Sequence, residues 1–313
     1  MVSAVIFVAT SCVSPLTGFA FWETNLAYEG ESIYNYLQVK NLSDRTILST
    51  NVLFGVQSVT MKDKGLTGMY YDTALAAPAL ADNANSALIL GMGTGTYARQ
   101  LKQYYPKMNI TGVEIDQKIT DLAGEYFDEP ADIPVTTYDG RAWLAASHDK
   151  YDVIMVDAYQ DITIPFQMSS TEFFTMVREH LNPGGVMVVN MNMISDGQGS
   201  INEALSDTIA SVFGNGNTLT ADVPNTTNRE LFAKKPGSGS EENSMQQASK
   251  ALNLRETTYE RTGSEDLEWY MEEVASRFRK VNEPDSASTI LTDDKAPVEV
   301  LGMHAIDQII ADE

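Results

Sequence analysis

Residues 87–105 read ALILGMGTGTYARQLKQYY, and this stretch decides the fold. A short apolar run, typical of a buried strand, enters a glycine-rich loop, and the residues after the loop are typical of a helix. Glycine lets a backbone pass close to a ligand, and the first turn of the following helix offers free N–H groups. The order strand, tight turn and helix therefore predicts a nucleoside site built around Gly91, Gly93, Thr94 and Gly95.

Three acidic residues follow apolar runs further along the chain. Glu114 ends the next apolar run, 23 residues after Gly91, where an acid commonly accepts hydrogen bonds from ribose hydroxyls. Asp139 follows the run VTTY, and Asp157 follows the run VIMV. Asp139 could contact a ligand, or it could cap a short helix that begins at Gly140. The two roles are compatible. Ligands of an open parallel sheet bind at the carboxyl ends of its strands, so these residues are expected to line one crevice.

Composition narrows the class of protein. The chain has 313 residues, 43% of them hydrophobic, which is enough for a sizeable core. Its formal net charge of −22 argues against binding to nucleic acid and favours a small cationic partner, with acidity that only maintains solubility as the alternative. The single cysteine, Cys12, excludes an internal disulfide. The three histidines are scattered without ligand spacing, so we expect no metal.

Hydrophobic periodicity divides the chain into segments. Period-two alternation interrupted by turns predicts a small antiparallel sheet, and alternating strand and helix patterns predict a doubly wound sheet with helices on both faces. A helix is expected over residues 69–80, with Pro78 interrupting its C-terminal part. The predicted segments are 1–25, an apolar leader; 26–66, the small β-sheet element; 67–235, a Rossmann-like nucleoside-binding domain; 236–249, a polar linker; and 250–313, a helical extension.

The apolar leader has three interpretations. No charged residue precedes Glu23, and the uncharged length is close to the roughly 20 residues that span a membrane. The leader is read first as the end of a membrane segment, and otherwise as an uncleaved anchor or a buried leading segment. We expect a cytoplasmic protein, with membrane association through this leader as the open alternative.

Several short motifs occur in a fixed order: ESIYNYLQV and GVQS in the predicted small sheet, then YYD, GMGTG, VEID, YDG and YDVIMVD. Together they resemble the spermidine synthase family, the polyamine aminopropyltransferases, from about residue 31 to about residue 235. The phrases DAYQDITIPFQMSSTEFF and LTDDKAPVE resemble a divergent branch that is often fused to membrane segments. The resemblance implies a Rossmann-like, methyltransferase-type α/β domain after a small antiparallel sheet, and a homodimer joined through that sheet.

The resemblance also implies roles for matched residues. Glu114 would bind the ribose of decarboxylated S-adenosylmethionine, and Asp139 with Gly140 would contact the adenine. Asp157 matches the catalytic aspartate, which accepts the proton that an attacking amine of pKa about 10 must lose. The residues matched to the neighbourhood of an amine such as putrescine are Asn35, Tyr70, Tyr71, Gln160 and Asp161.

Three positions depart from the family pattern. Thr94 stands where family members carry an aspartate that holds the aminopropyl ammonium. Gln160 replaces the second acid of the catalytic loop, where Asp161 could substitute by a shift of one residue, and a channel tyrosine is missing near Thr226. A buried ammonium without its carboxylate is costly, so the amine half of the site is altered while the nucleoside half is retained.

The leading prediction is a transferase that moves an aminopropyl group to a polyamine, with Asp157 as the base. Methyl transfer from S-adenosylmethionine is the second enzyme hypothesis, because the glycine loop suits methyltransferases and Thr94 spares the carboxylate of that cofactor from repulsion. A non-catalytic nucleoside or polyamine sensor is the third. Retention of Asp157 favours an enzyme.

Overall fold

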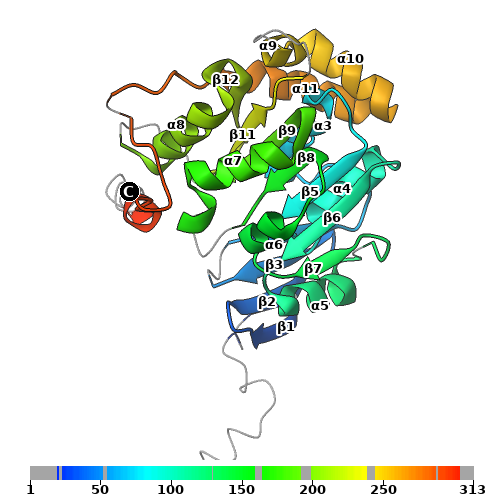
Figure 1. Ribbon diagram of the computed structural model, residues 1–313. Helices are drawn as coiled ribbons and strands as arrows, with labels where there is room; N and C mark the ends of the chain where they lie inside the picture. The colour runs from blue at the N-terminus through cyan, green and yellow to red at the C-terminus, as the bar shows by residue number, and fades with distance from the viewer. Residues whose placement is uncertain are drawn as a thin grey trace, which may run out of the picture.

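The computed structural model describes residues 20, 23–51, 55–128, 130–158, 164–191, 199–237, 244–286 and 288–303. Most of the predicted leader lies outside these ranges, as do Gln160 and Asp161. Across the described ranges, no helix is both long and apolar enough to cross a membrane. The described chain forms two sheets, drawn in Figure 1 as a small blue sheet below a larger one.

The small sheet has four antiparallel strands in chain order: β1 (Leu26–Glu31), β2 (Tyr36–Asn41), β3 (Arg45–Thr50) and β4 (Ser58–Met61). Its apolar face packs on helix α5 (Gln117–Tyr126) of the larger unit, where Leu37 and Leu48 belong to one buried cluster with Leu122. Period-two alternation therefore produces a half-buried sheet that is fastened to the main domain.

The large sheet has eight strands in the order β12-β10-β11-β9-β8-β5-β6-β7. Strands β5 to β9 run parallel, and β11, β10 and β12 continue the sheet in antiparallel fashion. The bounds are β5 (Ser86–Leu90), β6 (Asn109–Glu114), β7 (Val135–Thr137), β8 (Tyr151–Val156), β9 (Leu181–Met191), β10 (Thr218–Asp222), β11 (Arg229–Lys234) and β12 (Phe278–Lys280). The predicted α/β class, with a small antiparallel sheet before a Rossmann-like sheet, is confirmed.

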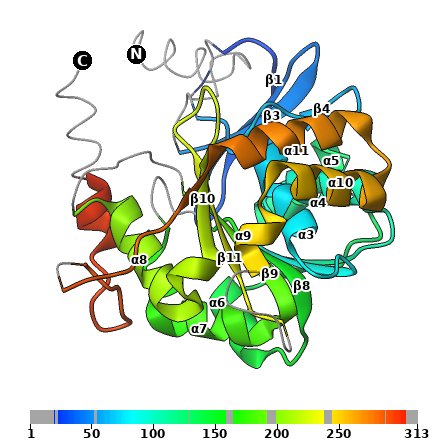
Figure 2. The ribbon, with the colours of Figure 1, turned by 90° about the horizontal axis from the view of Figure 1, so that it is seen from above.

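Helices cover both faces of the large sheet, as Figures 1 and 2 show. One face carries α2 (Tyr70–Ala74), α3 (Ala76–Leu80), α4 (Thr96–Tyr104), α9 (Ser244–Ala248), α10 (Ala251–Thr262) and α11 (Glu265–Arg277). The other face carries α6 (Gly140–Ala146), α7 (Thr171–His180) and α8 (Ile201–Phe213). Alternate residues of each buried strand supply the two cores, as expected for a sheet covered on both faces.

The helix expected over residues 69–80 divides into α2 and α3 at Leu75, and Pro78 explains the break. Proline has no N–H, so the carbonyl of Ala74 loses its usual partner four residues later. The buried hydroxyl of Tyr97 donates to that carbonyl at 3.0 Å instead. A side chain from α4 thus satisfies the backbone group that the proline leaves open.

The segment after residue 250 contains more than helices. Helices α10 and α11 pack against each other, and α10 also contacts α3. Strand β12 then pairs with β10 and forms one edge of the large sheet. The predicted helical extension is therefore built into the same domain as the strands before it.

Candidate active site

A pocket of about 310 Å³ opens at the carboxyl ends of the parallel strands. Of the predicted site residues, Gly91, Gly93, Glu114, Asp139, Gly140, Asp157, Asn35 and Tyr71 line it. Thr94, Gly95 and Tyr70 do not, and Gln160 and Asp161 lie outside the described residues. The remaining lining residues come from the small sheet and its loops, from β6, α5 and the turns after β5, β6, β7 and β8, and from the 3₁₀ turn η2 (Phe166–Met168) with the residue before it.

The glycine loop follows β5 and turns through positive φ at each of its glycines. A Cβ on Gly91 (φ 87°) would lie 2.3 Å from the carbonyl oxygen of Asp157, so only glycine allows this approach. Gly95 (φ 79°) is the N-cap of α4, and no side chain caps the N–H groups of that first turn. The loop thereby places the end of β5 directly against the end of β8.

Glu114 ends β6 and is buried in the pocket wall. Its carboxylate accepts one N–H from Gly93 at 2.8 Å and one from Asp116 at 3.0 Å. Burial raises the pKa of Glu114 and the Asp116 carboxylate raises it further, while these backbone hydrogen bonds oppose the shift. A carboxylate has about four acceptor positions, so two remain for a pair of ribose hydroxyls. The site residues therefore fit a nucleoside.

Asn35 lines the pocket, but its side chain is held by protein groups. Its Nδ2 donates to Asp116 at 3.0 Å, and its Oδ1 accepts from Asn51 at 2.9 Å. Ser32 donates to the same Asp116 oxygen at 2.6 Å. Asp116 also caps α5 by accepting the N–H of Lys118, so these contacts fasten the small sheet to the pocket rim.

Asp139 lies at the end of the loop after β7 and caps α6 by accepting the N–H of Ala142 at 2.7 Å. Its neighbour Gly140 begins the helix and lines the pocket. Asp139 therefore caps the helix, as the sequence suggested. It also lines the pocket, where its other acceptor positions remain.

Asp157 follows β8 and is partly exposed in the pocket. Its two oxygens accept from the hydroxyl of Tyr70 at 2.7 Å and from Nδ2 of Asn190 at 3.0 Å. Burial raises the pKa of Asp157 to about 7, these two hydrogen bonds lower it, and the charge of Glu114 raises it. An acid whose pKa lies near neutrality can exchange a proton with a bound reactant.

The tyrosine pair lies beside this acid. The rings of Tyr70 and Tyr71 have centroids 4.0 Å apart, and both side chains are largely buried. The hydroxyl of Tyr71 donates to the backbone carbonyl of Gln57 in the segment before β4. The pair thus holds Asp157 on one side and the small sheet on the other.

Thr94 occupies the glycine loop but is fully buried, and its hydroxyl has no hydrogen-bond partner among the described residues. Its side chain is not among the residues that line the pocket. The described ranges also contain no group of three His, Cys, Asp or Glu side chains arranged to hold a metal ion.

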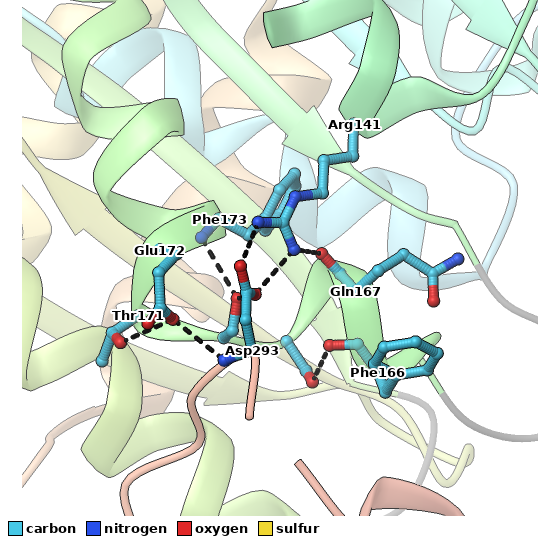
Figure 3. A network of polar contacts seen from close by, with 9 residues as sticks. Arg141, Phe166, Gln167, Thr171, Glu172, Phe173 and Asp293 are labelled. Carbon is cyan, nitrogen blue, oxygen red and sulfur yellow. Dashed lines mark hydrogen bonds and ion pairs between the residues drawn. The ribbon is translucent and has the colours of Figure 1, made fainter. Parts of the chain in front are cut away.

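A segment near the C-terminus contacts residues beside the pocket, and Figure 3 shows its Asp293 against Arg141. We call residues 291–295 the C-terminal strap. Asp293 of the strap accepts two hydrogen bonds from Arg141, at 2.7 and 2.6 Å, and Arg141 also donates to the carbonyl of Gln167 at 2.7 Å. Ser170 donates to Asp293 at 2.5 Å, and the Asp293 N–H donates to Glu172 at 3.1 Å. The strap therefore ties α6 and η2, which both line the pocket, to the start of α7.

Several of these residues are missing from the sequence prediction. Asn190 follows the apolar run Val186–Val189 in β9, as Asp157 follows the apolar run of β8, so the same pattern could have predicted it. Arg141 and Asp293 are 152 residues apart, and no local pattern joins them. The LTDDKAPVE phrase marked the segment of Asp293 without indicating its partner.

The structure is an α/β domain with a pocket and a partly exposed acid at the ends of its parallel strands. The spermine/spermidine synthase domain, as a family, matches residues 69–235, which is more than half of the chain. The chain belongs to this family.

Individual comparisons agree with that assignment. A polyamine aminopropyltransferase of Corynebacterium efficiens is 37% identical over 131 residues, covering 38% of this chain and 25% of that protein. The matched part therefore spans about a quarter of that relative. A probable spermidine synthase from Corynebacterium glutamicum has a TM-score of 0.59 at 22% identity, covering 85% of this chain and 99% of that one. Human methyltransferase-like protein 13, solved with SAH, has a TM-score of 0.50 at 22% identity, covering 63% and 95%. These structures confirm the methyltransferase-type fold.

Proposed function

We propose that this protein is an aminopropyltransferase that moves the aminopropyl group of decarboxylated S-adenosylmethionine to an amine such as putrescine. The observation that carries the proposal is the position of Asp157. It lies in the same pocket as Glu114, accepts hydrogen bonds from Tyr70 and Asn190, and has a pKa of about 7. Family membership and the name of the C. efficiens relative support the same activity.

The donor is assigned to the side of the pocket nearest the glycine loop. Glu114 is held by Gly93 and Asp116 with acceptor positions to spare for the ribose hydroxyls. The adenine is assigned to the wall formed by Asp139, Gly140 and Met168, where a Cβ on Gly140 would approach the Met168 methyl group at 3.6 Å. This assignment leaves the sulfonium end of the donor near Asp157.

The reaction follows from the charge of each group. The amine nitrogen attacks the methylene carbon attached to sulfur, and the carbon–sulfur bond breaks to leave methylthioadenosine as a neutral thioether. The amine must first lose a proton, and Asp157 accepts it. A carboxylate of ordinary pKa near 4 would be a poor base for an amine of pKa about 10, whereas the raised pKa of Asp157 narrows that difference.

One observation favours methyl transfer as a second candidate. The buried Thr94 supplies no carboxylate to hold an aminopropyl ammonium, and a carboxylate there would repel the amino acid end of S-adenosylmethionine. The two functions differ in donor and in product, so one assay separates them.

The test incubates the protein with putrescine and either donor and identifies the nucleoside product. Aminopropyl transfer predicts methylthioadenosine and spermidine from the decarboxylated donor. Release of S-adenosylhomocysteine from S-adenosylmethionine would move the protein to the methyltransferases. Binding of a donor without turnover of either would support the sensor hypothesis.

A further inference from the structure

A chain of side-chain hydrogen bonds runs from Asp157 to a turn outside the pocket. Nδ2 of Asn190 donates to Oδ1 of Asp157 at 3.0 Å, and Nδ2 of Asn228 donates to Oδ1 of Asn190 at 2.9 Å. Asp157 follows β8, Asn190 is in β9, and Asn228 directly precedes β11. Neither asparagine is among the residues that line the pocket. The acid of the pocket is therefore connected to the loop between β10 and β11 through one buried amide.

The amide of Asn190 can donate to Asp157 in only one orientation. An amide has a donor end and an acceptor end, whereas an ionised carboxylate only accepts hydrogen bonds. If the amide were reversed, its oxygen would face Asp157 and two acceptors would oppose each other. The two ends are similar in shape, so packing alone does not select between them. The donor on the far side does, because Nδ2 of Asn228 can bond only to the oxygen end.

The turn that carries Asn228 is itself held in place. Strands β10 and β11 form a hairpin in which Asp222 is opposite Arg229. Within its loop, the hydroxyl of Thr226 accepts the N–H of Asn228 at 3.1 Å and donates to the carbonyl of Val223 at 3.2 Å. The N–H of Val223 donates to the carbonyl of Asn228 at 3.0 Å. These contacts fix the backbone of Asn228 and give Thr226 a role in the turn.

We propose that Asn228 is a positioning residue for Asp157, because it holds the Asn190 amide in the orientation that presents the NH2 group to the carboxylate. The inference rests on the proposed function and adds to it a residue that does not line the pocket. Asn228 acts through Asn190, so its effect should disappear when Asn190 is replaced by a side chain without an amide. That dependence separates positioning from a general structural role in the turn.

The expected consequence is a change in the ionisation of Asp157. A hydrogen bond donated to the ionised form lowers the pKa of an acid, and Asn190 supplies one such bond. The titratable groups that face Asp157 within the described ranges are Tyr70 and Tyr71 of α2, Glu114 of β6 and Glu230 of β11. The substitutions in the test leave all of these groups in place, so a shift in the pKa of Asp157 reports the amide.

The ionisation of Asp157 can be followed without turnover. The full-length protein is labelled with aspartate carrying 13C at Cγ, and the Asp157 signal is the one that Asp157→Asn lacks. Its chemical shift is titrated against pH in the wild type and in Asn228→Leu, which removes the donor and keeps a branched side chain. We expect Asn228→Leu to raise the pKa of Asp157 by about half a unit to one unit. The same substitution should have no effect in a protein that already carries Asn190→Leu.

Two further variants keep the test decisive. Asn225→Gly alters an exposed residue of the same turn whose φ is 59°, a conformation that glycine adopts readily. This control should leave the pKa of Asp157 unchanged. Thermal unfolding establishes that each variant is folded. If Asn228→Leu is not, Asn228→Ala takes its place, since it also removes the donor and adds no apolar bulk to the turn.

Kinetics give a second readout. In Asn228→Leu, kcat/KM for putrescine should fall roughly three- to tenfold at pH 6 and return close to the wild-type value at pH 9, where Asp157 is ionised in both proteins. A merely structural role would lower kcat/KM by the same factor at both pH values, and that result would contradict the proposal.

Each outcome of the titration decides the proposal. An unchanged pKa of Asp157 in Asn228→Leu overturns it, whether or not the protein transfers an aminopropyl group. A rise of equal size in the Asn190→Leu background also overturns it, since Asn228 would then act by another route. A rise that requires Asn190 supports it. If that rise is found in a protein that turns over neither donor, the proposed function fails and the positioning of the Asp157 carboxylate stands.

Discussion

Arg141 and Asp293 are joined by two hydrogen bonds of 2.7 and 2.6 Å although 152 residues separate them in the chain. The pair connects α6, which begins at the pocket, to the C-terminal strap. Arg141 directly follows Gly140 of the pocket wall and also holds the carbonyl of Gln167, another lining residue. Through Arg141, the strap thus contacts the residues next to the wall that we propose for the adenine.

Loss of this pair should weaken nucleoside binding. Asp293→Asn removes the charge that Arg141 contacts, and we expect the Kd for methylthioadenosine to rise about three- to tenfold. The global unfolding midpoint should change little, because the pair is partly exposed to solvent. Calorimetric titration and thermal unfolding measure the two effects. The control is Lys102→Gln, which breaks a surface ion pair with Asp132.

The ionisation of Asp293 sets the pH range in which the strap should contribute to nucleoside affinity. Arg141, followed by Ser170, lowers the pKa of Asp293 below its ordinary value. A lowered pKa contributes stability that is present above the unfolded pKa and is lost as pH falls through the folded one. Asp293 should therefore stay ionised at neutral pH, and its contribution to nucleoside affinity in the wild type should be lost only as the pH falls below the ordinary pKa of an aspartate. If Asp293→Asn binds the nucleoside as tightly as the wild type, the strap has no positioning role.

Glu114→Gln should reduce nucleoside affinity by about 10- to 100-fold. The variant keeps the shape of the side chain but replaces one acceptor oxygen by a donor, which cannot accept both a backbone N–H and a ribose hydroxyl. Binding of methylthioadenosine is compared with binding of its 2′-deoxy analogue, which tests whether Glu114 contacts the ribose hydroxyls. The wild type should bind the 2′-hydroxyl compound more tightly, and Glu114→Gln should lose most of this difference in affinity. An unchanged difference would show that the ribose does not bind at Glu114.

The pH dependence of turnover should report Asp157. The base must be ionised, so kcat/KM should rise with pH through about 7, the pKa of Asp157. Tyr70→Phe removes a hydrogen bond that lowers this pKa, so the acid limb should move to higher pH, by up to roughly one unit. A limb that does not move in Tyr70→Phe would show that another group controls the rate.

The same shift makes a prediction about stability. A pKa raised in the folded state contributes stability below the unfolded pKa, and this is lost as pH rises toward 7. Asp157→Asn should therefore unfold at a higher temperature than the wild type at pH 8, and the difference should shrink below pH 4. Thermal unfolding across this range measures it.

Tyr97→Phe tests how Pro78 is accommodated between α2 and α3. The variant leaves the carbonyl of Ala74 without the hydroxyl that replaces its helical partner. The free energy of unfolding should fall by about 1–3 kcal/mol, measured by urea denaturation. Tyr104→Phe is the comparison, because Tyr104 is on the same helix and its substitution should lower the free energy of unfolding less. Equal losses would show that the Tyr97 hydroxyl has no special role.

The parts of the site that local patterns could predict are those at the ends of strands. Glu114 and Asp157 each follow an apolar run, and parallel strands bring such ends to one edge. The glycine loop could also be predicted, since Gly91 lies between an apolar run typical of a strand and a segment typical of a helix. The structure adds that Thr94 is buried away from the pocket, which the loop sequence alone could not show.

The other parts depend on contacts between distant segments. Asn35 is matched to the amine site by resemblance, yet its side chain is bound to Asp116 and Asn51. The register of β11 against β9 is likewise a property of the whole sheet, and the local sequence does not determine it. Strand β12 likewise completes the sheet edge from a segment whose sequence predicted helix.

The most direct test of the central claim is a single turnover of decarboxylated S-adenosylmethionine with putrescine, comparing the wild type with Asp157→Asn at pH 8. The account predicts that the wild type releases methylthioadenosine and that the variant binds the donor with similar affinity but reacts on the order of 10²- to 10⁴-fold more slowly. Equal rates in the two proteins, with donor binding intact, would contradict the assignment of Asp157 as the base.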